Sequence, residues 1–433
     1  MTELVSSAPM SRAVPGARLR FYAAWGMVAV LLAAFPSIFT SASSLTTFSL
    51  VGTAIIFALS YNILLGQTGL LSFGHAVYYG IGAFFAVHTM NLIPQYGLPV
   101  PLPLVPLIGG VAGLLLAILT GWISTRRAGT VFSMISLGVA ELAVALALIL
   151  TDFFGGEDGI STNRTKLPAW FGWHFGPQVQ VYYLVAFWVF VSALAMYALT
   201  RTPLGKICNA VRDNPERVQF VGYDPHIVRY LAFCFAGLFA GIAGALAAIS
   251  FESANFTDLG WVKSGAVIFS TYIGGTSIFA GPIVGAIFFV YLSLSLSDYT
   301  SVWQLYFGLL FILVVRYAPG GIGGTLLMHR MPFRVGGLGR ILRTYAIAAV
   351  PTLMLVGGFV LAVETIVHHT VNANEDPRIK AFGVSFDASS PMTWIVAGLL
   401  MLIGYFVGRL TWRGVTRAWD DARTIASERG IPS

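Results

Sequence analysis

Long runs of apolar residues, separated by short polar connections, make up most of the sequence. A helix rises about 1.5 Å per residue and the lipid core is about 30 Å thick, so about 20 apolar residues cross a membrane. The runs are continuously apolar instead of alternating, which predicts transmembrane helices and argues against a transmembrane barrel. We expect helices near residues 21–40, 46–65, 74–93, 104–124, 130–151, 180–200, 227–251, 264–278, 279–297, 302–318, 343–367 and 391–411.

The run at 264–278 is the weakest of the twelve. It is short and is interrupted by Ser264, Ser270, Thr271 and Gly274. Irregular backbone at membrane depth is tolerated only where protein covers it, so we expect either a full crossing or a broken or re-entrant helix there. The predicted fold is all-α, a polytopic transmembrane bundle of ten to twelve helices.

The composition supports the same class of protein. Hydrophobic residues make up 57% of the 433 residues and charged residues only 10%, whereas soluble domains carry about 25% charged residues. The net charge of +7 does not indicate a nucleic-acid partner, because the basic residues are scattered among the loops. The two cysteines cannot form a disulfide framework. We expect membrane lipid around the protein, and no nucleic acid, metal or cofactor.

The basic residues predict the orientation in the membrane. With the N-terminus inside, twenty of the 25 Lys and Arg residues lie on the cytoplasmic side, and the C-terminus lies there too. This asymmetry follows the positive-inside rule. A cleaved signal peptide is the alternative for the first helix, because basic residues precede it and small residues follow it. The length of the run favours a retained helix.

A polar, glycine-rich break separates the second and third runs. Residues 66–75 read Gly-Gln-Thr-Gly-Leu-Leu-Ser-Phe-Gly-His, and Gly66, Gly69 and Gly74 permit tight turns and close helix approach. A fainter echo at Gly274 and Gly275 faces the same side and suggests a parallel internal repeat. The alternative is a plain helix-helix turn with packing glycines. The polar candidates for lining a transport pathway are Gln67, Thr68, Ser72, His75 and Tyr78, with Glu141 in a later run.

The cytoplasmic stretch 201–226 contains Thr202-Pro203, Asn214-Pro215 and Asp224-Pro225. Each pair places a capping side chain before a proline suited to the first helical position, so we predict three helix starts and an elbow of two short helices. Its charged residues have no evident partner in the sequence, which suggests docking of another protein; a solvated loop is the alternative. The candidate contact residues are Gly205, Arg212, Asp213, Asn214, Glu216 and Arg217.

These segments together resemble a known family. The 66–75 run, the outer Gly155 to Gly159 motif, the stretch from Thr202 to Asn214 and the small-residue run from Ala236 to Leu246 are similar to the permease subunits of ABC importers for branched-chain amino acids, of the LivM type. The resemblance covers about residues 45–325. It implies a translocation pathway for branched-chain or related amino acids in a bacterial inner membrane; the importers of urea and short amides share the same motifs.

The resemblance also implies partners. A second, related permease subunit would form a heterodimer with this chain, two cytoplasmic ATPase subunits would dock on the elbow, and an extracytoplasmic solute-binding protein would deliver the solute. The sequence has no Gly-x-x-x-x-Gly-Lys-Ser/Thr phosphate loop, so we expect a transport subunit and not an enzyme. We divide the chain into a cytoplasmic segment 1–20, a permease core 21–325, and an extension 326–433 with two helices and a basic tail.

Two other classes of protein are less consistent with the sequence. An ion-coupled secondary transporter needs ionisable residues inside the membrane, and Glu141 has no basic partner in the same spans. A membrane metalloenzyme needs clustered ligands, and His368 and His369 beside Glu364 lack a convincing fourth one.

Overall fold

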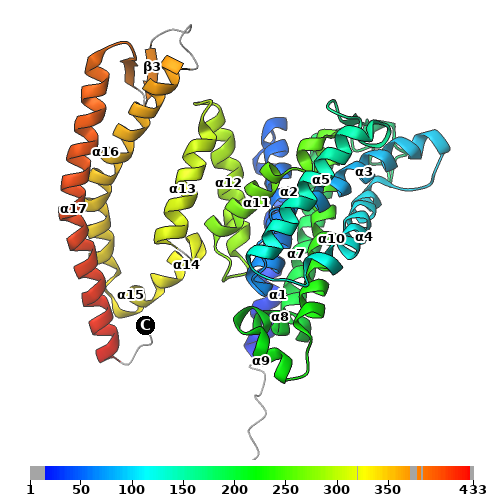
Figure 1. The fold of residues 1–433 in the computed structure, drawn as a ribbon, viewed down its shortest axis with the longest axis horizontal. Helices are drawn as coiled ribbons and strands as arrows, with labels where there is room; N and C mark the ends of the chain where they lie inside the picture. The colour runs from blue at the N-terminus through cyan, green and yellow to red at the C-terminus, as the bar shows by residue number, and fades with distance from the viewer. Residues whose placement is uncertain (1–14, 319, 371–377, 382–383, 430–433) are drawn as a thin grey trace, which may run out of the picture. The chain divides into compact units, whose positions relative to one another are not determined.

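The computed structural model describes residues 15–318, 320–370, 378–381 and 384–429 (Figure 1). The predicted N-terminal segment 1–20 therefore lies mostly outside the described residues, as do residues 371–377 and 382–383 of the connection between the last two helices. The chain forms two compact units, one up to Val290 and one from Tyr291 onwards. Almost all described secondary structure is helical, which confirms the predicted all-α fold.

Nine helices among the described residues are long and apolar enough to cross a membrane, or ten if the bent pair at 303–317 and 321–334 counts as one span. The sequence predicts ten to twelve. The nine helices are α1 (Pro15–Ile38), α2 (Ala42–Asn62) with its continuation to Thr68, α3 (Ala76–Tyr96), α4 (Val105–Ser124), α5 (Thr130–Ile149), α7 (Gln178–Arg201), α10 (Pro225–Phe251), α16 (Leu338–Thr370) and α17 (Pro391–Glu428).

Two of the predicted spans are shorter helices, α11 (Trp261–Gly274) and α12 (Gly281–Ser297), which this count leaves out. The 14 residues of α11 rise only about 21 Å, less than the lipid core. A Cβ placed on Gly285 would lie 1.8 Å from the carbonyl oxygen of Ser270, and one on Gly281 would lie 1.9 Å from that of Gly275. The two helices therefore meet backbone to backbone at a glycine turn, as expected for a broken or re-entrant element.

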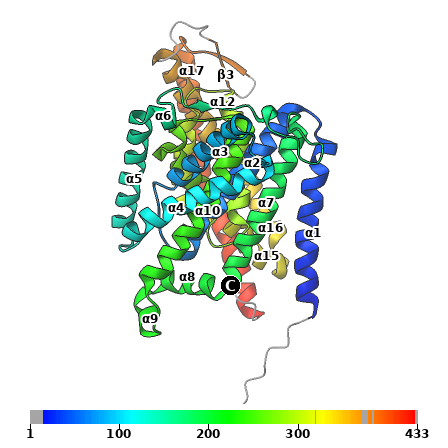
Figure 2. The same ribbon diagram turned by 90° about the vertical axis from the view of Figure 1, so that its right-hand side faces the viewer.

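Helix α10 is the core of the first unit and packs against α2, α3 and α4 (Figure 2). Small residues permit this close approach. A Cβ on Gly244 would lie 1.8 Å from the carbonyl oxygen of Tyr79 in α3, and one on Gly241 would lie 2.3 Å from that of Gly109 in α4. The run from Ala236 to Leu246 thus serves helix packing.

The loop between α5 and α7 is attached to the end of α10. Its strand β1 (Ile160–Ser161) pairs with β2 (Ser253–Ala254), which follows α10. The guanidinium of Arg164 donates to the carbonyl oxygens of Ile249 and Ser250 at 3.1 Å and pairs with Glu252 at 3.3 Å. A cation at this position stabilises the carbonyl end of a helix. The short elements of this loop are α6 (Thr151–Phe154) and a 3-10 turn, η3 (Arg164–Lys166).

The second unit is built on a helical hairpin of α16 and α17. A Cβ on Gly404 would lie 2.6 Å from the backbone nitrogen of Leu355, so the two helices touch closely. Helix α17 continues to Glu428, so the residues after 411, which the sequence predicts as a basic tail, belong to the same helix as the last apolar run. The other elements are α13 (Trp303–Tyr317), α14 (Gly321–Met328), α15 (Arg330–Val335) and the paired strands β3 (Arg378–Ala381) and β4 (Val384–Asp387).

Candidate functional site

The predicted break is a change of helix type followed by a turn. Helix α2 ends at Asn62, a π-helix (η1) runs from Ile63 to Thr68, and Gly69 then takes φ +71°. Only glycine adopts this left-handed conformation without strain. Single π-helical turns inside α-helices are frequent at functional sites. The chain resumes as α3 at Ala76.

Side chains from three helices satisfy the backbone of the break. Hydroxyl groups on α2, α5 and α11 provide the partners, which removes the cost of burying an irregular segment. The bonds join Tyr61 to Ser72 (3.2 Å), Ser133 to Leu71 (2.7 Å), Ser136 to Phe73 (3.0 Å) and Ser264 to Ala76 (3.0 Å).

The two glycine-rich breaks meet. A Cβ placed on Gly66 would lie 2.9 Å from the carbonyl oxygen of Thr276, in the turn between α11 and α12. In that turn Gly275 has φ +100°, and a Cβ on Gly274 would lie 2.0 Å from the carbonyl oxygen of Gly281. Gly66 therefore connects the π-helix to the turn between α11 and α12, and we call this contact the Gly66 junction.

The elbow has the three helix starts that the sequence predicts. Helix α8 (Pro203–Asp213) and helix α9 (Pro215–Phe220) form it, and α10 begins at Pro225. Each start has a side-chain cap on a backbone N–H and a proline in the first turn. The caps are Thr202 to Gly205 (3.3 Å), Asn214 to Arg217 (2.9 Å) and Asp224 to His226 (2.8 Å). Gly222, at φ +93°, lies just beyond α9.

Arg212 connects the elbow to the Gly66 junction. Its Nη1 donates to the carbonyl oxygen of Gly66, and its Cγ lies 3.0 Å from the position of a Cβ on Gly69. The same guanidinium pairs with Asp213 at 3.1 Å. The expectation that Arg212 has no partner within the chain is therefore wrong. Sequence reasoning missed the contact because its acceptor is a backbone carbonyl 146 residues away.

The other elbow residues divide into two groups. Gly205 and Asn214 are structural: a Cβ on Gly205 would lie 2.4 Å from the carbonyl oxygen of Leu199, and Asn214 caps α9. Asp213, Glu216 and Arg217 are exposed.

The elbow also carries an apolar tip that sequence reasoning missed. Phe220 is 91% exposed, Val221 71% and Tyr223 49%. The sequence does contain a signal for this tip. Residues 220–223 read Phe-Val-Gly-Tyr, an apolar stretch within the segment 201–226, which was interpreted from its charged residues. Beside the tip, Asp213, Arg217, Val221 and Tyr223 line a groove of about 340 Å³.

Four of the predicted pathway residues are buried inside this chain. His75 contacts the hydroxyl of Ser60 at 3.0 Å and stacks on Phe57 with ring centres 5.4 Å apart. The hydroxyl of Tyr78 lies 2.7 Å from that of Thr120. Thr68 donates to its own helix, and Ser72 has its backbone bound by Tyr61. In this conformation these side chains support the break and do not face an open passage.

The other two predicted pathway residues, Gln67 and Glu141, are not fully buried. Gln67 is half-buried beside a cavity of about 10 Å³ that Gly205 and Cys208 of the elbow also line. Its Oε1 is buried without a hydrogen-bond partner among the described residues. Burial raises the pKa of the Cys208 thiol to about 12, so the sulfur stays protonated at neutral pH and is a poor nucleophile. Glu141 is exposed near the middle of α5.

A bundle of apolar helices with a break after α2, a glycine turn between two short helices and an elbow that reaches the break is consistent with a multi-pass membrane permease. The chain belongs to the family described as the branched-chain amino acid transport system permease component, which matches residues 23–315. Most of the second unit, from residue 316, lies beyond this match.

Curated relatives support the assignment. The permease protein LivM of Salmonella typhimurium is 27% identical over 292 residues, which are 62% of this chain and 67% of that protein. The probable LivM of Methanocaldococcus jannaschii is 25% identical over 329 residues, 63% of this chain and 90% of that protein. The permease protein LivH of Salmonella typhimurium is 24% identical over 297 residues, which are 64% of this chain and 92% of that protein. No solved structure matches the chain.

Proposed function

We propose that this chain is the permease subunit of an ATP-driven ABC importer for branched-chain or related amino acids, with ATP hydrolysis in separate subunits. The contact between Arg212 and Gly66 carries the proposal. It joins a surface elbow, which can dock a partner, to the break where the two discontinuous elements meet. Force applied to the elbow therefore acts directly on the Gly66 junction.

In the mechanism that follows, the ATPase subunits close and reopen on the elbow. Helices α8 and α9 move as a unit, because they share Asn214, which ends α8 and caps the start of α9. The guanidinium of Arg212 moves with α8 and shifts the π-helix Ile63–Thr68. Because glycines form both breaks, the backbone there changes conformation at low cost. This alternates access to a pathway near the break.

The elbow tip has the chemistry of a protein-binding surface. A phenylalanine that is 91% exposed gains free energy when it enters an apolar pocket, and aromatic anchors commonly dominate binding energies. The exposed charges of Glu216 and Arg217 lie in the same short helix as this anchor and would fix its orientation. We propose that Phe220 inserts into a pocket of the ATPase.

Replacing the anchor tests this docking. Phe220→Ala is expected to lower co-purification of the ATPase about tenfold or more, because a buried aromatic anchor is worth about 2 kcal/mol or more. Uptake should fall in parallel, while the amount of permease in the membrane stays constant. The matched control is Phe171→Ala, since Phe171 is 87% exposed in the loop between α5 and α7. Equal ATPase recovery from both variants would contradict the docking site.

The proposed orientation, with both ends in the cytoplasm, places the elbow on the side of the ATPase. The basic residues of the sequence support it. The loop between α5 and α7 then faces the outside, where we propose that a solute-binding protein docks. If changing Phe220 alone abolishes ATPase binding, that result will support this orientation too, because a cytoplasmic ATPase reaches only that side.

A second permease subunit is supported by α5. Glu141 lies near the middle of this span and is exposed among apolar side chains such as Leu137 and Leu142. A carboxylate facing lipid at this depth costs about 2.5–3.5 kcal/mol, so protein or an aqueous passage covers it. The similarity to both LivM and LivH supports a related permease as the covering subunit.

The cargo proposal rests on the family. Branched-chain or related amino acids come first, since the family is described by transport of branched-chain amino acids. Urea or a short amide is the alternative, because importers of those solutes share the motifs of the break and elbow. Uptake assays with labelled leucine and labelled urea distinguish the two.

A further inference from the structure

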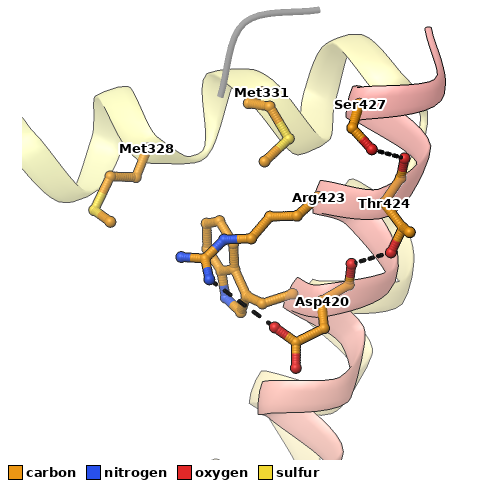
Figure 3. Close-up of a pocket in the computed structure, with 7 residues that line it drawn as sticks. Met328, Met331, Asp420, Arg423, Thr424 and Ser427 are labelled. Atoms are coloured by element: carbon orange, nitrogen blue, oxygen red, sulfur yellow. Dashed lines mark hydrogen bonds and ion pairs between the residues drawn. The ribbon is translucent and has the colours of Figure 1, made fainter.

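A groove of about 690 Å³ lies in the second unit, between α14 and α15 on one side and α17 on the other (Figure 3). Its lining combines apolar and polar groups. The apolar lining comes from Met328, Met331 and Trp419. The polar lining comes mainly from Arg423, Thr424 and Ser427, which share one face of α17. This part of the chain is outside the region that matches the permease family.

The groove lies at the boundary between membrane and water. The apolar run of α16 begins after Arg343. Trp419 is level with the start of that run, since its Nε1 donates to the hydroxyl of Tyr345 at 2.8 Å. Tryptophan and tyrosine are enriched at the headgroup level because one part of each ring system is apolar and the other is polar. The end of α17 beyond Trp419 therefore reaches the headgroup layer.

The two segments that contain the groove carry an excess of positive charge. The segments 326–343 and 409–429 contain nine arginines and three acidic residues, an excess of six in a chain whose net charge is +7. Among the described charged residues, one cation, Arg423, and one anion, Asp420, line the groove itself. Asp420 pairs with Arg423 at 3.9 Å, but both side chains are mostly exposed, and such pairs are weak. Asp421 pairs with Arg340 instead.

We propose that this groove binds one anionic phospholipid of the surrounding membrane. Its phosphate lies at the guanidinium of Arg423, and one acyl chain lies along Met328 and Met331. The hydroxyl of Thr424, which donates to the carbonyl oxygen of Asp420 at 2.6 Å in this structure, turns to donate to the phosphate instead. Arginine binds phosphate through charge-assisted hydrogen bonds, and clustered basic residues beside a transmembrane helix favour anionic lipid. Methionine adapts to an irregular apolar chain because it is unbranched. A bound lipid at this site fixes α15 against α17.

The test measures binding of phosphatidylglycerol to the purified full-length chain in neutral detergent, by native mass spectrometry over a lipid titration. The detergent removes the charged membrane surface, so only a discrete site retains lipid. The parent should bind one phosphatidylglycerol more tightly than phosphatidylcholine. Arg423→Gln should weaken phosphatidylglycerol binding about tenfold, as expected for loss of a charge-assisted contact. The matched control Arg417→Gln removes the same charge from an exposed position of α17 outside the groove and should change binding less than about twofold.

Thr424→Val gives a second test at constant charge, with Thr416→Val as its control on the same helix. Weaker phosphatidylglycerol binding in Thr424→Val alone supports the site. Equal losses in Arg423→Gln and Arg417→Gln would overturn the proposal, because they would show attraction to charge without a site. Equal binding of phosphatidylcholine by the parent, or displacement of the lipid by millimolar inorganic phosphate, would also overturn it.

Discussion

Gly244→Ala is expected to cost the folded protein about 3 kcal/mol, at the upper end of what overpacking typically costs. The new methyl group would lie 1.8 Å from the carbonyl oxygen of Tyr79. The methyl carbon and the carbonyl oxygen cannot move apart by a side-chain rotation, because each is bonded directly to a helix backbone in the core of the first unit. Helices α3 and α10 would separate, and the break that begins α3 would lose its support.

The measurement is the amount of folded protein in the membrane together with its thermal unfolding midpoint. Gly398→Ala is the control, since Gly398 lies in transmembrane helix α17 and a Cβ added there would meet no described atom within 4 Å beyond its own helix backbone. Alanine there should be neutral or stabilise the helix by about 1 kcal/mol. Similar midpoints for the two variants would show that α3 and α10 do not pack as described.

Arg212→Gln is expected to lower uptake about tenfold or more while ATPase binding remains. The lost contact is a charged hydrogen bond to the carbonyl oxygen of Gly66, and such bonds contribute about 1.5–3 kcal/mol. Without it, the elbow can dock the ATPase but no longer moves the π-helix with it. ATP hydrolysis by the assembled complex should continue without matching transport.

Asp213→Asn is the control for Arg212. Asp213 is the neighbouring charge and pairs with the same guanidinium, but this pair is exposed and does not include the break. Its removal should leave uptake within about twofold of the parent. If Arg212→Gln instead lowers ATPase binding and uptake in the same proportion, Arg212 is a docking residue and the proposed connection to the break is wrong.

The positions of most helices could be predicted from the sequence, because long apolar runs and the lipid thickness determine them. The elbow could be predicted too, because capping residues before Pro203, Pro215 and Pro225 act within a few positions along the chain. The number of spans could not. Whether α11 crosses depends on the glycine turn that folds it back, and this contact joins two helices.

The candidate site was predicted less completely than the fold. The polar character of residues 66–75 indicated a break, but burial of His75 and Tyr78 depends on neighbours such as Phe57 and Thr120. The contact of Arg212 was hidden because its acceptor is a main-chain group. The exposed Phe220 was overlooked because apolar residues in the chain were attributed to membrane spans.

The most direct test of the central claim is uptake of labelled leucine into proteoliposomes that contain this chain, its second permease and the ATPase, with the solute-binding protein outside. We predict uptake that requires ATP inside the vesicles and does not change when a proton gradient is imposed. Leucine uptake that follows the proton gradient without ATP would contradict this prediction and would make the protein a secondary transporter.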